Sequence, residues 1–170
     1  MIRFNLIFNL IIWFIDMKWL VYGGKGWIGG QVLNILNSLN EEVVIGSARV
    51  DDTISVESEL KSEVPDRVLC LIGRTHGPGY STIDYLEQKG KLVENIRDNL
   101  FSPVTLAILC QKMNIHLTYL GTGCIFTDTV PEESKGYNES SLPNFTGSGY
   151  STVKGFTDRL MHMFDDSVLN

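Results

Sequence analysis

Three observations in the sequence predict a doubly wound parallel α/β sheet. Short apolar runs of strand length alternate with segments whose apolar residues recur at helical spacing. The first and third of these runs stop at glycine, and the first leads into a glycine-rich turn followed by an amphipathic segment. Such alternation is typical of parallel strands joined by crossover helices. Ligands of such sheets bind at the carboxyl ends of the strands, so we expect the site there.

The first half of the chain contains three predicted strands and two predicted helices. Residues 18–22 are an apolar run, which indicates a buried strand. Residues 28–39 carry apolar side chains at helical spacing. Residues 42–46 form the second apolar run, which indicates the second strand. Residues 56–64 form a short charged helix that ends before a proline, and residues 67–73 form the third strand.

The second half contains the remaining elements of the predicted sheet. Residues 83–99 have apolar side chains at helical spacing, and 104–113 continue the pattern. A proline between them either opens a new helical turn or kinks the helix. Residues 115–120 are the fourth strand, 126–149 form a loop rich in proline, glycine, serine and asparagine, and 150–164 the final helix.

Composition and charge exclude several classes of protein. The chain has 170 residues, 44% hydrophobic and 20% charged, which indicates one globular domain and excludes collagen, coiled coil and wholesale disorder. The net charge is −6 without any basic cluster. This argues against a nucleic-acid binder, which needs a basic face to displace counterions.

The cysteines and histidines lack the spacing of a metal site. We therefore expect no metal, and free thiols in a reducing compartment such as the cytoplasm. The residues concerned are Cys70, Cys110, Cys124, His76, His116 and His162.

The first residues are strongly apolar and stand apart from the predicted sheet. Residues 1–15 are shorter than the roughly twenty apolar residues of a membrane-spanning helix. No small-residue cleavage site follows Asp16, which argues against a signal peptide. A membrane-surface anchor is one interpretation. We favour an apolar extension, residues 1–16, ahead of a folded domain over 17–170 whose functional start is Met17.

The turn after the first strand has the spacing GxxGxxG. Gly23, Gly26 and Gly29 would give a tight turn, close approach to a pyrophosphate and close helix–strand packing. The helix that follows supplies amide donors and a partial positive charge. The strand–turn–helix context indicates a Rossmann-like dinucleotide site, with Trp27 and Ile28 at the start of the helix also contacting the cofactor.

The end of the second strand distinguishes NADP from NAD. Ser47 and Arg49 suit a 2′-phosphate, and Asp51 or Asp52 instead approaches the adenine. We therefore favour NADP(H), with NAD(H) as the alternative. Arg49 as a solvated surface charge is the other interpretation.

Tyr150 and Lys154 lie one helical turn apart and face the same side. An ammonium beside a phenol favours the phenolate, so we expect Lys154 to lower the pKa of Tyr150 from its usual value of about 10. Thr122 follows the fourth strand, where its hydroxyl would bond the same substrate oxygen.

The order of these motifs resembles the extended short-chain dehydrogenase/reductase superfamily. The segments YGGKGWIGG, ENIRDNLFSPVTLAILC, TGCIF and PNFTGSGYSTVK are similar to those of the nucleotide-rhamnose synthases, which are UDP-4-keto-6-deoxyglucose 3,5-epimerase/4-reductases. The dTDP-4-dehydrorhamnose reductases are the next nearest. The resemblance implies NADPH-dependent reduction, together with 3,5-epimerisation, of a nucleotide-linked 4-keto-6-deoxyhexose.

The resemblance also implies residue roles. Thr122, Tyr150 and Lys154 would form the catalytic triad, with Tyr150 giving a proton to the C4 oxygen and Lys154 holding the nicotinamide ribose. Asn99 would support the triad lysine, and Gly73 would contact the cofactor. The residues bordering the substrate would be Asn144, Phe145, Thr146, Gly147 and Ser148.

Two features depart from the family pattern. Residues 71–74 read Leu-Ile-Gly-Arg in place of the usual Asn-Ala-Ala, so the cofactor contacts there are expected to differ from the family's. Family members also run to nearly twice this folded length, so the last strands and most of the substrate domain are expected to be absent. A non-catalytic NADP-binding subunit or an inactive remnant is therefore the alternative function, and a homodimer stays open.

Cys124 is a candidate base for the epimerisation. Alternation along a strand end would place it on the same face as Thr122. A thiolate removes a proton alpha to a ketone when nearby positive charge lowers its pKa. GDP-fucose synthase, which the chain also resembles here, has a cysteine at the matching place. The alternative interpretation is that Cys124 is simply a small apolar residue of the core.

Overall fold

The computed structural model describes residues 17–128, 136–164 and 168–169. The predicted extension over residues 1–16 lies outside these residues, as does the middle of the predicted 126–149 loop. Within the described part, none of the helices has the length and apolarity needed to cross a bilayer.

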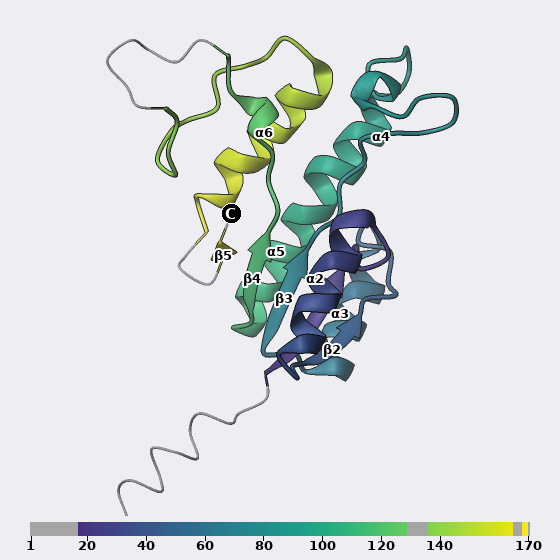
Figure 1. Cartoon of the computed structure of the whole chain (residues 1–170), viewed down its shortest axis with the longest axis vertical. Helices are drawn as coiled ribbons and strands as arrows, with labels where there is room; N and C mark the ends of the chain where they lie inside the picture. Colours follow the sequence, from purple (N-terminus) through teal and green to yellow (C-terminus); the bar gives the residue numbers. More distant parts are fainter. Residues whose placement is uncertain (1–16, 129–135, 165–167, 170) are drawn as a thin grey trace, which may run out of the picture.

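The described strands form one parallel sheet in the order β2-β1-β3-β4-β5, which confirms the predicted fold class (Figure 1). The prediction of four strands was incomplete, because the fifth is a two-residue strand with no apolar run to mark it. The strands are β1 (Lys18–Tyr22), β2 (Glu42–Ile45), β3 (Arg67–Cys70), β4 (His116–Tyr119) and β5 (Val168–Leu169).

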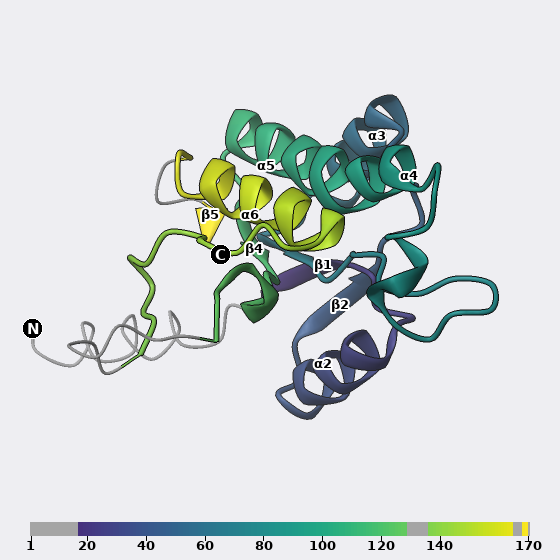
Figure 2. The same cartoon turned by 90° about the horizontal axis from the view of Figure 1, so that it is seen from above.

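Helices cover both faces of the sheet. Figure 2 shows α2 (Trp27–Ser38) on one face, with α3 (Thr53–Glu63), α5 (Ser102–Met113) and α6 (Gly149–Met161) on the other. The main core lies beneath the second group, where fully buried strand residues such as Leu20, Val68 and Leu117 belong to one cluster with helix residues such as Leu106. This two-sided cover explains the continuous apolar strand runs.

The predicted helix over residues 83–99 starts later than expected. Ile83–Tyr85 form only a 3₁₀ turn, and Gly90 takes a left-handed conformation with φ of +86° that interrupts any helix. Helix α4 (Leu92–Ile96) then runs without a break through a π-helical segment, η3 (Arg97–Phe101), into α5.

Pro103 accounts for how this long helix is joined to α6. It lies in the first turn of α5 and has no N–H, so the carbonyl of Asn99, four residues earlier, loses its usual helical partner. The buried hydroxyl of Thr157 in α6 donates to that carbonyl at 2.6 Å. The proline neither ends nor begins the helix; it frees an acceptor that ties α6 to the π-helical segment.

The N-terminus of α6 is held by a residue distant in sequence. Ser148 caps the helix by accepting a bond from the N–H of Ser151 at 3.0 Å. The Glu87 carboxylate accepts from the N–H groups of Gly149 and Tyr150, both at 2.8 Å. A carboxylate at this end of a helix also complements the helix dipole. Glu87 therefore fixes the turn that carries Tyr150.

Replacing Glu87 with alanine should destabilise the fold by about 1 kcal/mol, the usual cost of losing a helix cap. The reason is that two N–H groups of α6 lose their acceptor. Urea denaturation would measure the loss, and Lys89→Ala in the same exposed loop serves as the control. Equal stability of both variants would show that water replaces the carboxylate at no cost.

Candidate functional site

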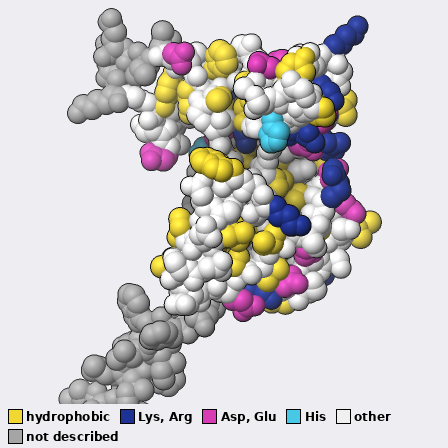
Figure 3. Space-filling model, turned by 45° about the vertical axis from the view of Figure 1, so that its right-hand side comes forward, with side chains coloured by type: hydrophobic (Ala, Val, Ile, Leu, Met, Phe, Trp, Pro, Cys, Tyr) yellow, Lys and Arg dark blue, Asp and Glu magenta, His cyan; other side chains and the backbone are white. Residues whose placement is uncertain are grey.

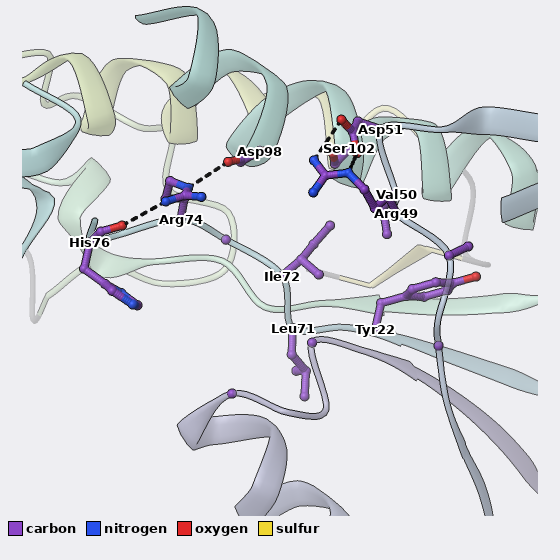
Figure 4. A pocket seen from close by; sticks show the side chains of 15 residues that line it. Tyr22, Arg49, Val50, Asp51, Leu71, Ile72, Arg74, His76, Asp98 and Ser102 are labelled. Carbon is purple, nitrogen blue, oxygen red and sulfur yellow. Dashed lines mark hydrogen bonds and ion pairs between the residues drawn. The ribbon is translucent and has the colours of Figure 1, made fainter. Parts of the chain in front are cut away.

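A pocket of about 470 Å³ lies at the carboxyl ends of β1, β2 and β3 (Figure 4). This is the edge at which the sequence predicts ligand binding. On the face drawn in Figure 3, arginine and lysine side chains lie close to acidic ones. The pocket is lined by Tyr22, Gly23, Gly26, Gly46, Ala48, Arg49, Val50, Asp51, Leu71, Ile72, Gly73, Arg74, His76, Asp98 and Ser102.

The glycine turn forms one wall, and two of its glycines are sterically required. Gly23 has a φ of +87°, and a Cβ there would lie 2.7 Å from the carbonyl carbon of Leu71. A Cβ on Gly29 would lie 2.2 Å from the carbonyl oxygen of Gly23. Gly26 caps α2 without any side-chain hydrogen bond to the first turn. The turn thus brings an uncapped helix N-terminus to the pocket, as a pyrophosphate site requires.

The two residues at the start of α2 project outward. Trp27 is 83% exposed and Ile28 is 43% exposed. Both follow Gly26 directly, so their main-chain N–H groups belong to the uncapped first turn.

Charged residues after β2 form the opposite wall. Arg49 is exposed and its Nε lies 3.0 Å from the Asp51 carboxylate. Arg97 approaches the same carboxylate at 3.7 Å. Asp52 caps α3 by accepting from the N–H of Ser55 at 3.2 Å. Of the two acidic residues considered for the adenine, Asp51 lines the pocket, whereas Asp52 serves the helix.

Ser47 is engaged by a residue that the sequence analysis missed. Its N–H and hydroxyl both donate to the Glu59 carboxylate, at 2.7 and 2.6 Å. Glu59 lies in a charged helix among several other acidic side chains, so no pattern in the sequence singles it out.

The loop after β3 is held by Asn99. The Asn99 side chain accepts from the N–H of Arg74 at 2.9 Å, donates to its carbonyl at 3.0 Å and donates to Asn95 at 2.9 Å. A Cβ on Gly73 would lie 3.3 Å from the Asn99 oxygen. The resemblance implied that Asn99 supports Lys154, and the structure shows its side chain clamping the pocket wall.

The side chain of Arg74 is held by two carboxylates. Its Nε lies 3.0 Å from both Glu94 and Asp98. Its guanidinium also lies over the ring of Tyr85, 5.6 Å from the ring centroid. The departure from the family pattern at residues 71–74 thus places a well-anchored arginine in the pocket wall.

Thr122, Cys124 and Tyr150 lie close to one another, and none of them is among the residues that line the pocket. Burial raises the pKa of Tyr150, a hydrogen bond with Thr122 opposes that rise, and the nearby Cys124 thiol adds to it. The strand alternation that we expected for Cys124 is wrong, because Gly123–Ile125 form a 3₁₀ turn. Within that turn the Cys124 N–H donates to the Thr122 hydroxyl at 3.3 Å, and the Cys124 residue is exposed.

Lys154 points to a partner that the sequence analysis did not identify. The residue is 4% exposed, and its ammonium donates to the Tyr119 hydroxyl, 4.5 Å from that ring's centroid. Burial lowers the pKa of Lys154 to about 8, opposed by the Cys70 and Asp158 charges. The expected lowering of the Tyr150 pKa by Lys154 is therefore wrong for this structure, since burial raises it and the ammonium lies with Tyr119.

Of the five expected substrate-border residues, Phe145 and Thr146 line a second, smaller cavity of about 210 Å³, whereas Asn144, Gly147 and Ser148 do not. Main-chain N–H groups of Asn144 and Phe145 donate to the carbonyl of Ile125, at 3.1 and 3.0 Å. These two bonds attach the segment to the turn that follows β4. The cavity is lined by Pro143, Phe145, Thr146, Ser151, Thr152, Gly155, Phe156 and Arg159.

Comparison with known proteins identifies close relatives, although no family model matches the chain. It is 62% identical over 156 residues to a protein of Acanthamoeba polyphaga mimivirus, covering 91% of this chain and 54% of that one. The crystal structure of that protein, described as a UDP-rhamnose synthase, superposes with a TM-score of 0.86 over 91% of this chain and 55% of that chain.

One further relative is similar in sequence, and one further solved structure is similar in fold. The chain is 34% identical over 154 residues to a trifunctional UDP-glucose 4,6-dehydratase/UDP-4-keto-6-deoxy-D-glucose 3,5-epimerase/UDP-4-keto-L-rhamnose-reductase of Arabidopsis thaliana, covering 89% of this chain and 22% of that one. A dTDP-4-dehydrorhamnose reductase from Bacillus anthracis, solved with NADP, shares the fold with a TM-score of 0.75 at 16% identity, over 91% of this chain and 52% of that chain.

The chain spans about half the length, or less, of the curated relatives that it matches. The matches cover the glycine turn, the long central helix and the segment that carries Tyr150, since they extend over about nine-tenths of this chain. The resemblance inferred from the sequence motifs is confirmed: the chain is a homologue of the nucleotide-rhamnose synthases.

Proposed function

We propose that residues 17–170 form an NAD(P)-binding domain that carries the catalytic edge of a nucleotide-sugar epimerase/reductase. The observation that carries the proposal is the pocket at the strand ends, beside a glycine turn whose backbone leaves no room for a Cβ at Gly29. A cradle that leaves no room for a Cβ and ends in an uncapped helix N-terminus fits the pyrophosphate of a dinucleotide. The residues present therefore fit the cofactor.

The cofactor-binding roles follow from the two walls of the pocket. The N–H groups at the start of α2, after Gly26, bind the pyrophosphate. Arg49, exposed beside Asp51, binds a 2′-phosphate, which favours NADP(H) over NAD(H). Gly73, held against Asn99, lets the chain after β3 approach the cofactor closely. When bound, the nicotinamide supplies the hydride for reduction of the C4 ketone.

Tyr150 is the proton donor in this proposal. Its pKa is raised, so the phenol carries its proton at neutral pH and holds it for the C4 oxygen. The Thr122 hydroxyl, already bonded to Tyr150, orients that oxygen and the phenol together. Lys154 leaves Tyr119 to bond the nicotinamide ribose, a movement that a flexible lysine side chain allows.

Cys124 is the proposed base for epimerisation at C3 and C5. Its exposed thiol lies close enough to Tyr150 to affect that group's pKa, so it borders the same reacting atoms. The substrate would be a UDP-linked 4-keto-6-deoxyhexose, bordered by residues 144–148. Three free thiols in the described residues suit a reducing compartment such as the cytoplasm.

The direct test mixes the chain with NADPH and a UDP-linked 4-keto-6-deoxyhexose and follows the loss of NADPH absorbance. Tyr150→Phe should lower the rate by a factor of about 10² to 10⁴ while NADPH affinity stays unchanged, because only the proton donor is lost. Tyr80→Phe, on an exposed loop, is the matched control.

A near wild-type rate in Tyr150→Phe would refute the assignment of the proton donor. NADPH binding by the unmodified chain without any oxidation would support the alternative function, a non-catalytic NADP-binding subunit.

Arg49→Ala should weaken NADPH binding on the order of tenfold and leave NADH binding within about twofold, because only NADPH has the phosphate that the guanidinium bonds. Fluorescence titration of both cofactors measures this, with Lys112→Ala as the control for loss of a remote positive charge. Equal weakening of both cofactors would show that Arg49 supports the pocket wall without recognising the phosphate.

Lys154 should make the stability of the fold depend on pH between about 8 and 10.5. Its folded pKa of about 8 lies below its ordinary value, so in this window the unfolded chain binds more protons than the native one. The free energy of unfolding therefore rises with pH, by about 3 kcal/mol from this group. Cys70, with a pKa raised to about 12, and Tyr119, with a raised pKa, stay protonated there.

Urea denaturation of the chain and of Lys154→Met across this pH range measures the effect. The difference in unfolding free energy between the two proteins should change with pH. Parallel curves would mean that Lys154 titrates near its ordinary pKa in the folded protein.

A further inference from the structure

The carboxylate of Glu59 lies behind the pocket wall that follows β2, where it is bonded to residues of that wall. Both oxygens of Glu59, from α3, accept hydrogen bonds. The donors are the N–H and hydroxyl of Ser47 at 2.7 and 2.6 Å, the N–H of Ala48 at 3.2 Å, and the Tyr22 hydroxyl at 2.7 Å. Four donors, from β1 and from the segment after β2, thus converge on one carboxylate of α3.

The chain is built to allow this convergence. A Cβ on Gly46 would lie 2.6 Å from the ring of Tyr22, so only glycine lets the end of β2 pass so close to that ring. This approach brings Ser47 and the Tyr22 hydroxyl to the same carboxylate. Burial raises the pKa of Glu59, but the bonds from Ser47, Tyr22 and Ala48 together hold it below its usual value. The group is therefore an anion at neutral pH.

The Glu59 carboxylate is separated from the pocket only by residues that line it. Tyr22 and Ala48, two of its partners, line the pocket, and so does Arg49. In sheets of this kind, the end of the second strand is where the 2′ position of the adenosine ribose is recognised. Donors of Ser47 that would serve a 2′-phosphate are already used by Glu59.

We infer that Glu59 is a specificity-determining residue that reduces the preference of this site for NADPH over NADH. The inference rests on the proposed function, since it concerns the same pocket. A 2′-phosphate carries a charge of about −1.5 to −2, so a fixed carboxylate behind the wall opposes it. The carboxylate also keeps Ser47 turned away from it. A neutral 2′-hydroxyl experiences no such repulsion.

The test is the ratio of the dissociation constants for NADH and NADPH, measured by fluorescence titration of the full chain. Glu59→Gln keeps the size of the side chain and removes its charge. The ratio should move toward NADPH on the order of threefold to tenfold. Glu57→Gln is the matched control, because Glu57 lies on the same helix and pairs with Lys61.

A second variant keeps the inference testable if Glu59→Gln does not fold. Ser47→Ala should leave both affinities within about twofold, because Ser47 serves Glu59 and not the cofactor. A selective loss of NADPH affinity in Ser47→Ala would show that Ser47 binds the phosphate, and would overturn the inference.

The outcomes separate this inference from the proposed function. An unchanged ratio in Glu59→Gln, or an equal loss of both cofactors, would reduce Glu59 to a support of the loop while the dinucleotide site stands. Failure of the unmodified chain to bind either cofactor would overturn the proposed function, and the inference with it.

Discussion

The close contact between Gly29 and the carbonyl oxygen of Gly23 allows the first turn of α2 to pack directly against the end of β1. At 2.2 Å from that oxygen, no Cβ fits on Gly29, and Gly23 itself is held against the Leu71 main chain after β3. The turn therefore joins β1, β3 and α2 through backbone alone. As a result, the N-terminus of α2, which has no side-chain cap, lies at the pocket, at the edge where the strands end.

A second contact connects the proposed catalytic residues to that pocket. Pro103 frees the carbonyl of Asn99, and Thr157 of α6 bonds it. The Asn99 side chain holds the loop after β3 at Arg74. One residue of the π-helical segment thus links the pocket wall to the helix that carries Tyr150. Such π-helical segments are frequent at functional sites, and here the geometry gives a reason, since the extra residue and the proline together leave an acceptor for α6.

The sheet and its helices follow from apolar periodicity, and the glycine turn follows from spacing, so the sequence was sufficient for both. It was insufficient for the limits of the shorter elements and for individual tertiary contacts. Gly90 breaks the predicted helix at 83–99, and β5 is too short to leave an apolar pattern. Single long-range partners were also invisible: Lys154 contacts Tyr119, and Ser47 contacts Glu59. Their residue types are common, so only the folded distances single them out.

The central claim is that the pocket at the ends of β1, β2 and β3 is the dinucleotide site. Amide chemical-shift mapping of the isotope-labelled chain during NADPH titration tests it most directly. We expect the shifts to concentrate at Gly26, Ile28 and Gly73, with little change along the smaller cavity around Phe145. Shifts that concentrate at that smaller cavity, with the glycine turn unaffected, would contradict the account.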